Sequence, residues 1–354
     1  MAARRSVYRL ERMSSACKDA DATPSHVVRL FEEDDAPGVI ALLNTAFGSW
    51  PHGIESLDAA EFFRWKHTES PFGESLRSVA VADQRIVGFA ALMPWRLRAG
   101  DRLVSAMRGG DIAVDPSYQR RGLSLSLIKE VAAMRERIAP GLYDFVWTNP
   151  NALSLSRTIE GGYRGAGAQP RYMRLHVPTR LRASLGRRAP RTVQPLGELP
   201  TAREALAGDV DPRLLSAPAR DRHPRLETVK DFDYLRWRYG ALTEYNAVRV
   251  KSGEELAIFR AREIGGYRMI EVCELLIERG DLLAARRLLR EVKRACRADL
   301  IACSFDSPYF AAACGFVRSP GGAALTIRPL RDDLSPDPTD HRSWALSLGD
   351  LELI

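Results

Sequence analysis

The sequence predicts an α/β protein that contains one module twice, each copy built as a mixed sheet flanked by helices. With 354 residues, the chain exceeds one typical domain. The segment EFFRWKHT at 61–68 returns as DYLRWRYG at 233–240, with an Arg-Trp pair in both segments. After each segment the same order of strands, helix, strand, short helix and strand follows. An internal duplication explains this repetition.

The first copy covers residues 26–177. Helices are expected where apolar residues recur every three or four positions, and strands where they alternate or form short runs. The expected strands are 26–31, 78–82, 85–100, 102–114, 144–148 and 172–177, and the expected helices are 34–47, 59–67, 123–137 and 152–162. Asp34 or Asp35 can cap the first helix, and a glycine ends the last one.

The second copy covers residues 213–333. Its expected elements are strands at 245–250, 255–261, 267–277, 299–305 and 324–330 and a helix at 281–295. Three segments lie outside the two copies: a tail at 1–25, an Arg/Pro-rich linker at 178–212 and a C-terminal tail at 334–354. The C-terminal tail ends in an amphipathic apolar run, which we expect to pack on the body of the protein.

The composition favours a cytoplasmic protein with an anionic partner. A net charge of +7 and a pI of about 9.3 allow either nucleic acid or a phosphorylated cofactor. Nucleic acid is the weaker candidate, because many arginines lie in the linker, where a solvated segment explains them. The five cysteines form no CxxC pair and the six histidines form no HExxH motif, so we expect reduced thiols and no metal site.

Two kinds of targeting segment are not predicted. No apolar run of about 18 residues could span a membrane. The N-terminal residues lack the apolar region of a secretory signal. The sequence carries no prediction of an oligomeric state.

The stretch DPSYQRRGLSLSLIKEV at 115–131 predicts an anion-binding site. A strand ends, the chain turns, and a helix begins near Gly122. The N–H groups of a first helical turn have no partners within the helix, and the helix dipole makes this end positive. Gly122 permits a close approach, Ser124 is small, and Arg120 and Arg121 add charge. We therefore expect a pyrophosphate to bind here, although neither a Walker loop nor a GxGxxG motif is present.

The same residues carry a resemblance to a known family. Gln119-Arg120-Arg121-Gly122-Leu123-Ser124 resembles the Q/R-x-x-G-x-G/A signature of the GNAT (GCN5-related N-acetyltransferase) superfamily, with Ser in the place of the last Gly or Ala. Further along, Asn151, Ser154 and Gly162-Tyr163 resemble its second pattern, N-x-x-S/A followed by G-F/Y. The chain is thus similar to tandem GNAT-like proteins with one degenerate copy.

The resemblance implies an acyl-CoA co-substrate, usually acetyl-CoA, and direct transfer of the acyl group to an amine. The N–H groups of residues 119–124 would bind its pyrophosphate. The strand residues Ile112, Ala113 and Val114 would diverge from the next strand and bind the pantetheine arm, and Ala113 or Val114 would offer an N–H to the acyl carbonyl. Asn151 and Ser154 would lie near the pantetheine.

Two residues are candidates for proton transfer. Asp111 stands where many relatives carry a carboxylate and is the expected general base; alternatively, it only caps the bend at Gly109-Gly110. Thr158 stands where many relatives have the Tyr that protonates the leaving thiolate. Because a threonine hydroxyl is short and a weak acid, water or another residue could take over this step.

The acceptor is expected to be the amine of a small molecule or an amino sugar. Candidate contacts are Trp50 and His52, between the first two helices, and Trp147 and Asn149, although aromatic residues more often belong to the core. Trp65 and Trp237 are expected to be structural, because both copies contain them. The alternative to an enzyme is an acyl-CoA sensor or scaffold without turnover.

The second copy lacks the motif. Its counterpart, ELLIERGDLLAARRLL at 274–289, retains Gly280, but Glu274, Glu278 and Asp281 would repel a pyrophosphate. Only the first copy is therefore expected to bind CoA, while the second shapes the acceptor site or completes a shared sheet. Asp350, Glu352 or the terminal carboxylate of the tail is a further candidate to reach the acceptor.

Overall fold

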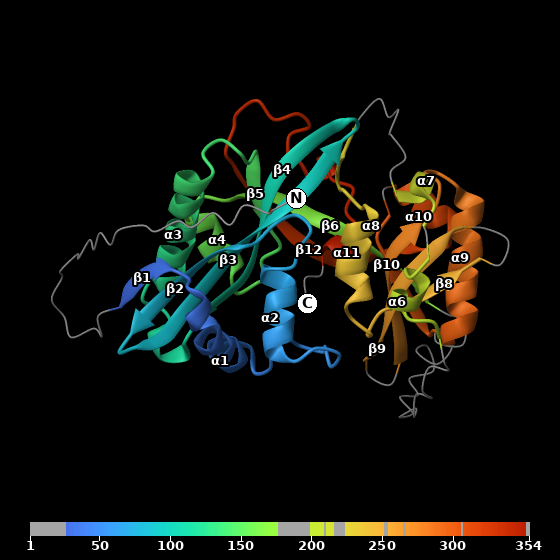
Figure 1. The fold of residues 1–354 in the computed structure, drawn as a ribbon. Coiled ribbons are helices and arrows are strands. Elements are labelled where there is room, and N and C mark those ends of the chain that lie inside the picture. Colours follow the sequence, from blue (N-terminus) through green and yellow to red (C-terminus); the bar gives the residue numbers. More distant parts are fainter. Residues whose placement is uncertain are drawn as a thin grey trace, which may run out of the picture.

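The computed structural model describes residues 26–175, 199–208, 210–215, 224–250, 254–264, 267–305 and 307–351. Both halves of this chain contribute to one mixed sheet of 12 strands (Figure 1). The strand order is β1-β2-β3-β4-β5-β12-β6-β11-β10-β9-β8, and β7 pairs with β3 off this path. The α/β class is confirmed, with the two copies sharing one sheet.

The first half follows the predicted order of elements. It contains β1 (Val27–Leu30), η1 (Glu33–Asp35), α1 (Ala36–Phe47), α2 (Ala59–His67), β2 (Leu76–Ala82), β3 (Arg85–Ala99), β4 (Arg102–Val114), η2 (Pro116–Tyr118), α3 (Leu123–Ile138), β5 (Phe145–Thr148), α4 (Leu155–Glu160) and β6 (Arg164–Leu175). The largest difference from the prediction is β6, which begins eight residues earlier than expected because the Gly-rich stretch at its start pairs with β12.

The second half repeats the order β-β-β-α-β-α-β. It contains α6 (Ala202–Ala205), α7 (Pro212–Leu215), β7 (Leu226–Thr228), α8 (Phe232–Leu235), η3 (Arg236–Gly240), β8 (Asn246–Arg249), β9 (Leu256–Ile264), β10 (Tyr267–Leu276), α9 (Leu282–Cys296), β11 (Leu300–Cys303), α10 (Pro308–Ala313), β12 (Val317–Pro329), η4 (His341–Ser343) and α11 (Leu348–Leu351).

The predicted linker at 178–212 is only partly a linker. Residues 176–198 lie outside the described residues, as does the predicted tail at 1–25. Thr201 caps α6 with its side chain, and Ala202 is fully buried with its N–H donating to the Tyr245 carbonyl at 2.8 Å. The end of the predicted linker therefore folds as part of the second half.

The helices of the first half cover both faces of the sheet. Side chains alternate between the faces of a strand, and on β3 Phe89 and Ala91 belong to the same core cluster as the buried residues of α1 and α2. The intervening Ala90 packs in a cluster with Leu123 and Leu127 of α3. Thus α1 and α2 lie on one face and α3 on the other.

The last strand of each half crosses into the other half. β6 pairs antiparallel with β11, and β12 pairs antiparallel with β5. The two crossing strands also pair with each other in the middle of the sheet. Each half is therefore completed by a strand of its counterpart, which unites both halves in one sheet.

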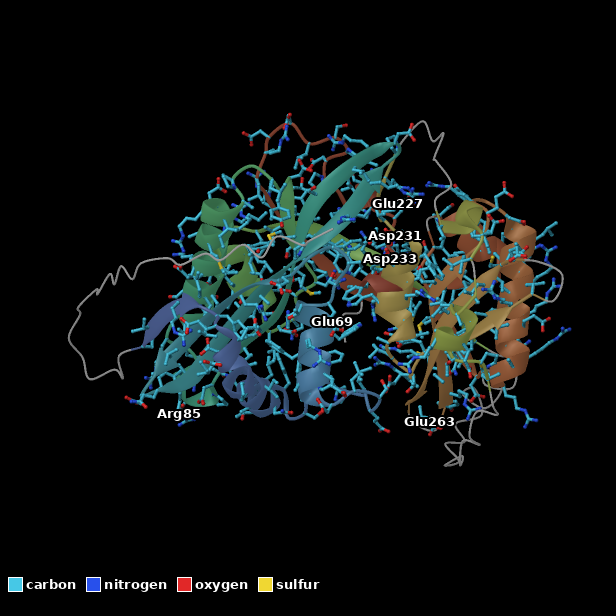
Figure 2. The ribbon with its side chains drawn as sticks, in the orientation of Figure 1. Glu69, Arg85, Glu227, Asp231, Asp233 and Glu263 are labelled. Atoms are coloured by element: carbon cyan, nitrogen blue, oxygen red, sulfur yellow. The ribbon has the colours of Figure 1, made fainter. Side chains whose placement is uncertain are left out.

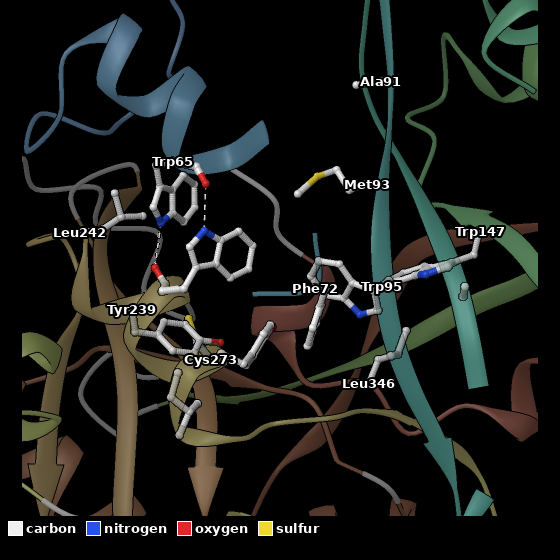
Figure 3. Packing of buried hydrophobic residues seen from close by; sticks show 14 of the residues in the cluster. Trp65, Phe72, Ala91, Met93, Trp95, Trp147, Tyr239, Leu242, Cys273 and Leu346 are labelled. Carbon is white, nitrogen blue, oxygen red and sulfur yellow. Dashed lines mark hydrogen bonds between the residues drawn. The ribbon is translucent and has the colours of Figure 1, made fainter. Parts of the chain in front are cut away.

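The repeated tryptophans meet across the two halves. Trp65 Nε1 donates to the Trp237 carbonyl at 2.8 Å, and Trp237 Nε1 donates to the Trp65 carbonyl at 2.9 Å (Figure 3). The two rings stack with centroids 5.1 Å apart. This reciprocal contact agrees with the expected structural role of both residues.

A short strand of the second half also extends the first. β7 pairs with the end of β3, and Glu227 of β7 accepts from Arg98 of β3 at 2.9 Å. Figure 2 shows Glu227 with Asp231 and Asp233 in the middle of the molecule, between the two halves. β7 was not predicted, because a three-residue strand has too few side chains to show a period.

Candidate functional site

Two adjacent strands of the first half separate near the middle of the sheet. β4 and β5 run parallel and pair at Ala106–Phe145, Met107–Val146 and Arg108–Trp147. β5 ends at Thr148, whereas β4 continues to Val114. We call the space beside residues 109–114 of β4 the opening. It lies where the predicted divergence of the strand at Ile112, Ala113 and Val114 requires it.

The loop after β4 has the backbone of an anion site. Arg120 and Gly122 both adopt positive φ, +63° and +77°, whereas Gln119 between them and the strand is extended. Alternation of this kind turns successive N–H groups toward one side, which forms a concave anion site. No atom lies within 4 Å of the position that a Cβ on Gly122 would take, so the space before α3 is open.

The polar side chains of this loop lie at the surface of the protein. Gln119, Arg120 and Arg121 are exposed, and Leu123 is buried beneath them. Gln119 Nε2 donates to the Val114 carbonyl at 3.2 Å, which ties the loop to the strand end. We call residues 119–124 the cradle; their conformation and charge fit a pyrophosphate.

Asp111 lies in a bulge of β4 at the opening. Phe89 of β3 faces Ala113, and Ala91 faces Gly110, so that β4 contains one residue more than β3 in this interval. Asp111 has a φ of +48°. For a residue other than glycine this left-handed conformation costs about 1 kcal/mol, so surrounding contacts must hold it.

Two residues of α2 supply those contacts. Lys66 Nζ lies 2.9 Å from Asp111 Oδ1 and 2.8 Å from Oδ2. His67 Nε2 lies 3.1 Å from Oδ2, and its Nδ1 lies 3.0 Å from Ser75 Oγ. Since a carboxylate only accepts, Nε2 carries the proton and Nδ1 accepts from the serine. We call Lys66, His67 and Asp111 the clamp.

The clamp changes the acidity of Asp111. Burial alone would raise the pKa of this carboxyl, but the charge of Lys66 and the hydrogen bonds from His67 and Lys66 outweigh it and hold the pKa well below its usual range. Burial also lowers the pKa of Lys66 and of His67. A carboxylate with a lowered pKa is a weak proton acceptor. The geometry therefore disfavours the general-base role that the sequence suggests for Asp111.

The second sequence pattern builds the start of α4. Asn151 Oδ1 accepts from the N–H groups of Leu153 and Ser154 at 3.0 and 2.9 Å, and Ser154 Oγ donates to it as well. Thr158 is buried, and its Oγ1 donates to the Ser154 carbonyl at 2.9 Å. The hydroxyl proton of Thr158 is thus committed to the helix backbone, which leaves this residue poorly suited to act as an acid.

The predicted acceptor residues do not form one surface. Trp50 is 7% exposed and packs edge-on against Phe62, whereas His52 is exposed and contacts Ser49 at 3.3 Å. Trp147 is fully buried in the core, so its ring offers no surface to an acceptor. Asn149 contacts the second half, because its Nδ2 donates to the Ala324 carbonyl at 2.9 Å.

Arg108 lies at the base of the opening, and the sequence analysis did not single it out. It is buried, and its guanidinium lies 5.1 Å from the ring centroid of Trp95 and 4.6 Å from that of Trp147. Its Nη1 donates to the Asp350 carbonyl. Burial lowers the pKa of Arg108 to about 9, which leaves it charged at neutral pH. None of these three partners is near Arg108 in sequence, so no local pattern could reveal the contacts.

The second half has a corresponding pair of strands, and the tail lies against it. β10 and β11 pair up to Val272–Cys303, and β10 continues to Leu276. Beyond that point Ser304 Oγ donates to the Leu346 carbonyl at 2.8 Å, and Ser347 Oγ donates to Glu274 at 2.9 Å. The C-terminal segment therefore occupies the position that the opening has in the first half.

The tail is held there by buried charges. Lys230 Nζ lies 2.6 Å from Glu274 Oε2 and 3.2 Å from Asp350 Oδ2. Asp350 is fully buried, and Lys230 lowers its pKa against the effect of burial. Its carboxylate is thus bound within the second half, which argues against the predicted contact with an acceptor. Glu352 and the terminal carboxylate lie outside the described residues.

Other classes of site find no support in the part of the chain that the structure describes. These residues bring together no group of three or more His, Cys, Asp or Glu side chains that could hold a metal ion. None of the helices among them combines the length and apolar character of a membrane span.

Comparisons with known proteins concern the family of one segment and the fold. Residues 27–140 match the family of acetyltransferase (GNAT) domains. Among solved structures, a GCN5-related N-acetyltransferase from Kribbella flavida is similar with a TM-score of 0.57 and 17% identity, covering 86% of this chain and 71% of that chain. A GCN5-related N-acetyltransferase from Anabaena variabilis has a TM-score of 0.57 and 11% identity, covering 87% and 73%.

A third similar structure is Eis1 from Mycobacterium abscessus, with a TM-score of 0.52 and 16% identity, covering 86% of this chain and 73% of that chain. At these identities the likeness concerns the fold. No curated protein sequence matches the chain.

Proposed function

Residues 27–140 of this chain form a GNAT acetyltransferase domain, and from this premise we propose that the chain transfers an acyl group, most simply acetyl, from acyl-CoA to the amine of a small molecule or amino sugar. The observation that carries the proposal is the continuity of the opening with the cradle. β4 lines the opening up to Val114, and the cradle begins five residues later.

Each part of the site has a separate role in binding acyl-CoA. The N–H groups of residues 119–124, with Arg120 and Arg121, hold the pyrophosphate. The free edge of β4 at 112–114 pairs with the amide groups of the pantetheine arm. Asn151 shapes the start of α4 beside that arm. The acyl carbonyl then lies near the bulge of β4, where a backbone N–H can stabilise the oxyanion.

The transfer itself needs no covalent intermediate on the protein. The neutral amine attacks the thioester carbon, the C–N bond forms, and the C–S bond breaks. The amine nitrogen loses one proton and the departing CoA thiolate gains one, so the step is balanced. Because Asp111 is held by the clamp and Thr158 by its own helix, we assign both proton transfers to water.

Acceptor binding is proposed on the side where the two halves meet. Asn149, just after β5, donates to the Ala324 carbonyl, and Arg108 of β4 donates to the Asp350 carbonyl, so both residues link the first half to the second. The second half and its tail therefore border the opening from the side opposite the cradle.

Two measurements on the whole chain test the proposal. Calorimetric titration should show one acetyl-CoA bound per chain, because only the first half has a cradle. Release of CoA thiol should be stimulated by at least one member of a panel of small amines and amino sugars. Acetyl-CoA binding without release for any amine would favour a sensor, and absence of binding would overturn the proposal.

A further inference from the structure

The bulge of β4 lies in the opening, where the proposed acyl transfer needs backbone N–H groups in fixed positions to stabilise the oxyanion. Asp111 and Ile112 together face the single residue Ala90 of β3, and Asp111 has a φ of +48°. A bulge changes the direction of the peptide groups that follow it. The conformation of Asp111 thus decides where the N–H groups of residues 112–114 point.

The clamp is built to hold that conformation. Lys66 and His67 are adjacent on α2, and both side chains are almost completely buried. α2 begins with a capping box between Asp58 and Glu61 and packs through Phe62 and Phe63 in the core. The side chain of Asp111 is therefore tied at both oxygen atoms to a rigid helix.

The second half contains the same arrangement without the left-handed residue. A bulge of β10 lies between Val272 and Glu274, and Tyr239, two positions after Trp237, donates to Glu274 Oε1 at 2.7 Å. His67 likewise stands two positions after Trp65. Among the described residues with positive φ, Asp111 appears and Glu274 does not.

The two halves therefore differ in more than the cradle. Arg238 stands where the first half has Lys66, and it donates to Tyr245 at 3.0 Å, whereas Lys66 binds the bulge carboxylate directly. The left-handed turn accompanies the lysine contact and occurs in the half that has the cradle. This association points to a role in the chemistry of the first half.

We propose that Lys66 and His67 are positioning residues, which hold Asp111 in its left-handed turn and thereby direct the N–H groups of residues 112–114 toward the acyl carbonyl. This inference rests on the proposed acyl transfer and deepens it. It assigns Asp111 the role of an anchor for the backbone, in place of the general base that the sequence suggests.

Two double variants separate these roles. K66M/D111N removes both charges together, and asparagine adopts left-handed backbone readily. K66M/D111A removes the same charges, but alanine avoids that conformation. The first variant should keep more of its kcat than the second, because asparagine adopts the left-handed turn more readily than alanine once the contact to Lys66 is lost. The second should lose about 10- to 100-fold in kcat, since the N–H donors are displaced. The KM for acetyl-CoA should change little in either variant, because the cradle is intact.

The outcomes decide between anchor and base. If K66M/D111N loses as much activity as K66M/D111A, and its pH–rate profile loses the acidic limb, Asp111 acts as the base and the inference is overturned. Full kcat in K66M/D111A would also overturn it. If K66M/D111A does not fold, K66M/D111G replaces it, because glycine also adopts the left-handed conformation. A retained kcat in K66M/D111G supports the role of Asp111 as a backbone anchor. A loss of kcat as large as that expected for alanine refutes this role.

The second half offers a matched control. Y239F removes the hydrogen bond to Glu274 at the corresponding bulge and should leave kcat unchanged. The ratio of acetyl-CoA to CoA affinity gives a readout that needs no acceptor: it should fall in K66M/D111A and persist in K66M/D111N. Wild-type protein that binds no acetyl-CoA would refute the proposed function, whereas binding and turnover with equal ratios in all variants would refute only the inference.

Discussion

The opening of the first half and its counterpart in the second half have the same arrangement of strands but different surroundings. In the first, β4 diverges from β5 beside a loop with exposed arginines. In the second, the tail lies at the divergence of β10 from β11, held by Glu274 and Lys230. The difference teaches that a repeated fold can keep its strands, bulge and tryptophan while one half carries a loop with the backbone of an anion site and the other half binds the tail of its own chain.

The largest effect should come from matched changes at the two helix starts. Gly122 precedes α3 with φ +77°, and Gly280 precedes the start of α9 with φ +83°; neither has an atom within 4 Å of a built Cβ. Gly122→Glu places a carboxylate in the cradle and should weaken acetyl-CoA binding on the order of 100-fold or more in calorimetry. Gly280→Glu introduces the same backbone strain and should leave that affinity unchanged. Equal losses in both variants would mean that strain, and not the cradle, controls binding.

Lowering the pH should change the contributions of Asp111 and Glu274 to the free energy of unfolding in opposite directions. The folded pKa of Asp111 is lowered, so its contribution to stability is present above the unfolded pKa of about 4 and is lost as pH falls through the folded pKa. Burial raises the pKa of Glu274 in spite of Lys230, so its contribution is present below the unfolded pKa and is lost as pH rises through the folded pKa.

Urea unfolding as a function of pH checks this contrast. Asp111→Asn should flatten the loss of stability below about pH 4, and Glu274→Gln should flatten the loss of stability that accompanies a rise of pH above about 4. The same sign of change in both variants would contradict the assignment of opposite shifts.

Substitution of Trp65 and substitution of Trp237 should lower the free energy of unfolding by similar amounts. Trp65→Phe and Trp237→Phe each leave one buried carbonyl without its N–H donor, which should cost about 2 kcal/mol of unfolding free energy in urea titrations. The double variant should show coupling, because the two rings stack. A cost several times larger on one side would show that the two halves depend on this contact unequally.

Thr158→Val should have the smallest effect. The change removes one hydrogen bond to the Ser154 carbonyl, so the unfolding free energy should fall by about 1 kcal/mol or less. The kcat of CoA release should remain unchanged across the pH range. A loss of turnover at a stability close to wild type would return Thr158 to the role of general acid.

The sequence could predict features that depend on neighbouring residues. The cradle, the helix after it and the repeated Arg-Trp segments all have local patterns, and the duplication follows from them. The clamp could not be predicted, because Lys66 and His67 meet Asp111 only after α2 packs on β4. For the same reason Trp147 looked available for an acceptor, whereas the strand exchange and the tail bury it.

The contacts of Arg108 and Asp350 show a second limit of sequence reasoning. Charged residues usually predict a solvated surface, yet both are buried: Arg108 donates to the backbone carbonyl of Asp350, and the Asp350 carboxylate binds Lys230 within the second half. Only the folded chain shows that these charges belong to its interior.

The exchange of β6 and β12 has a consequence for how the protein came to be and how it unfolds. A single ancestral module with this topology would have had to pair as two copies that traded their last strands, a domain-swapped dimer later fused into one chain. Because each half of the present sheet is closed by a strand of the other, neither can melt while its counterpart stays intact. The protein should therefore unfold in one cooperative transition, because the half with the cradle is closed by a strand of the half without one.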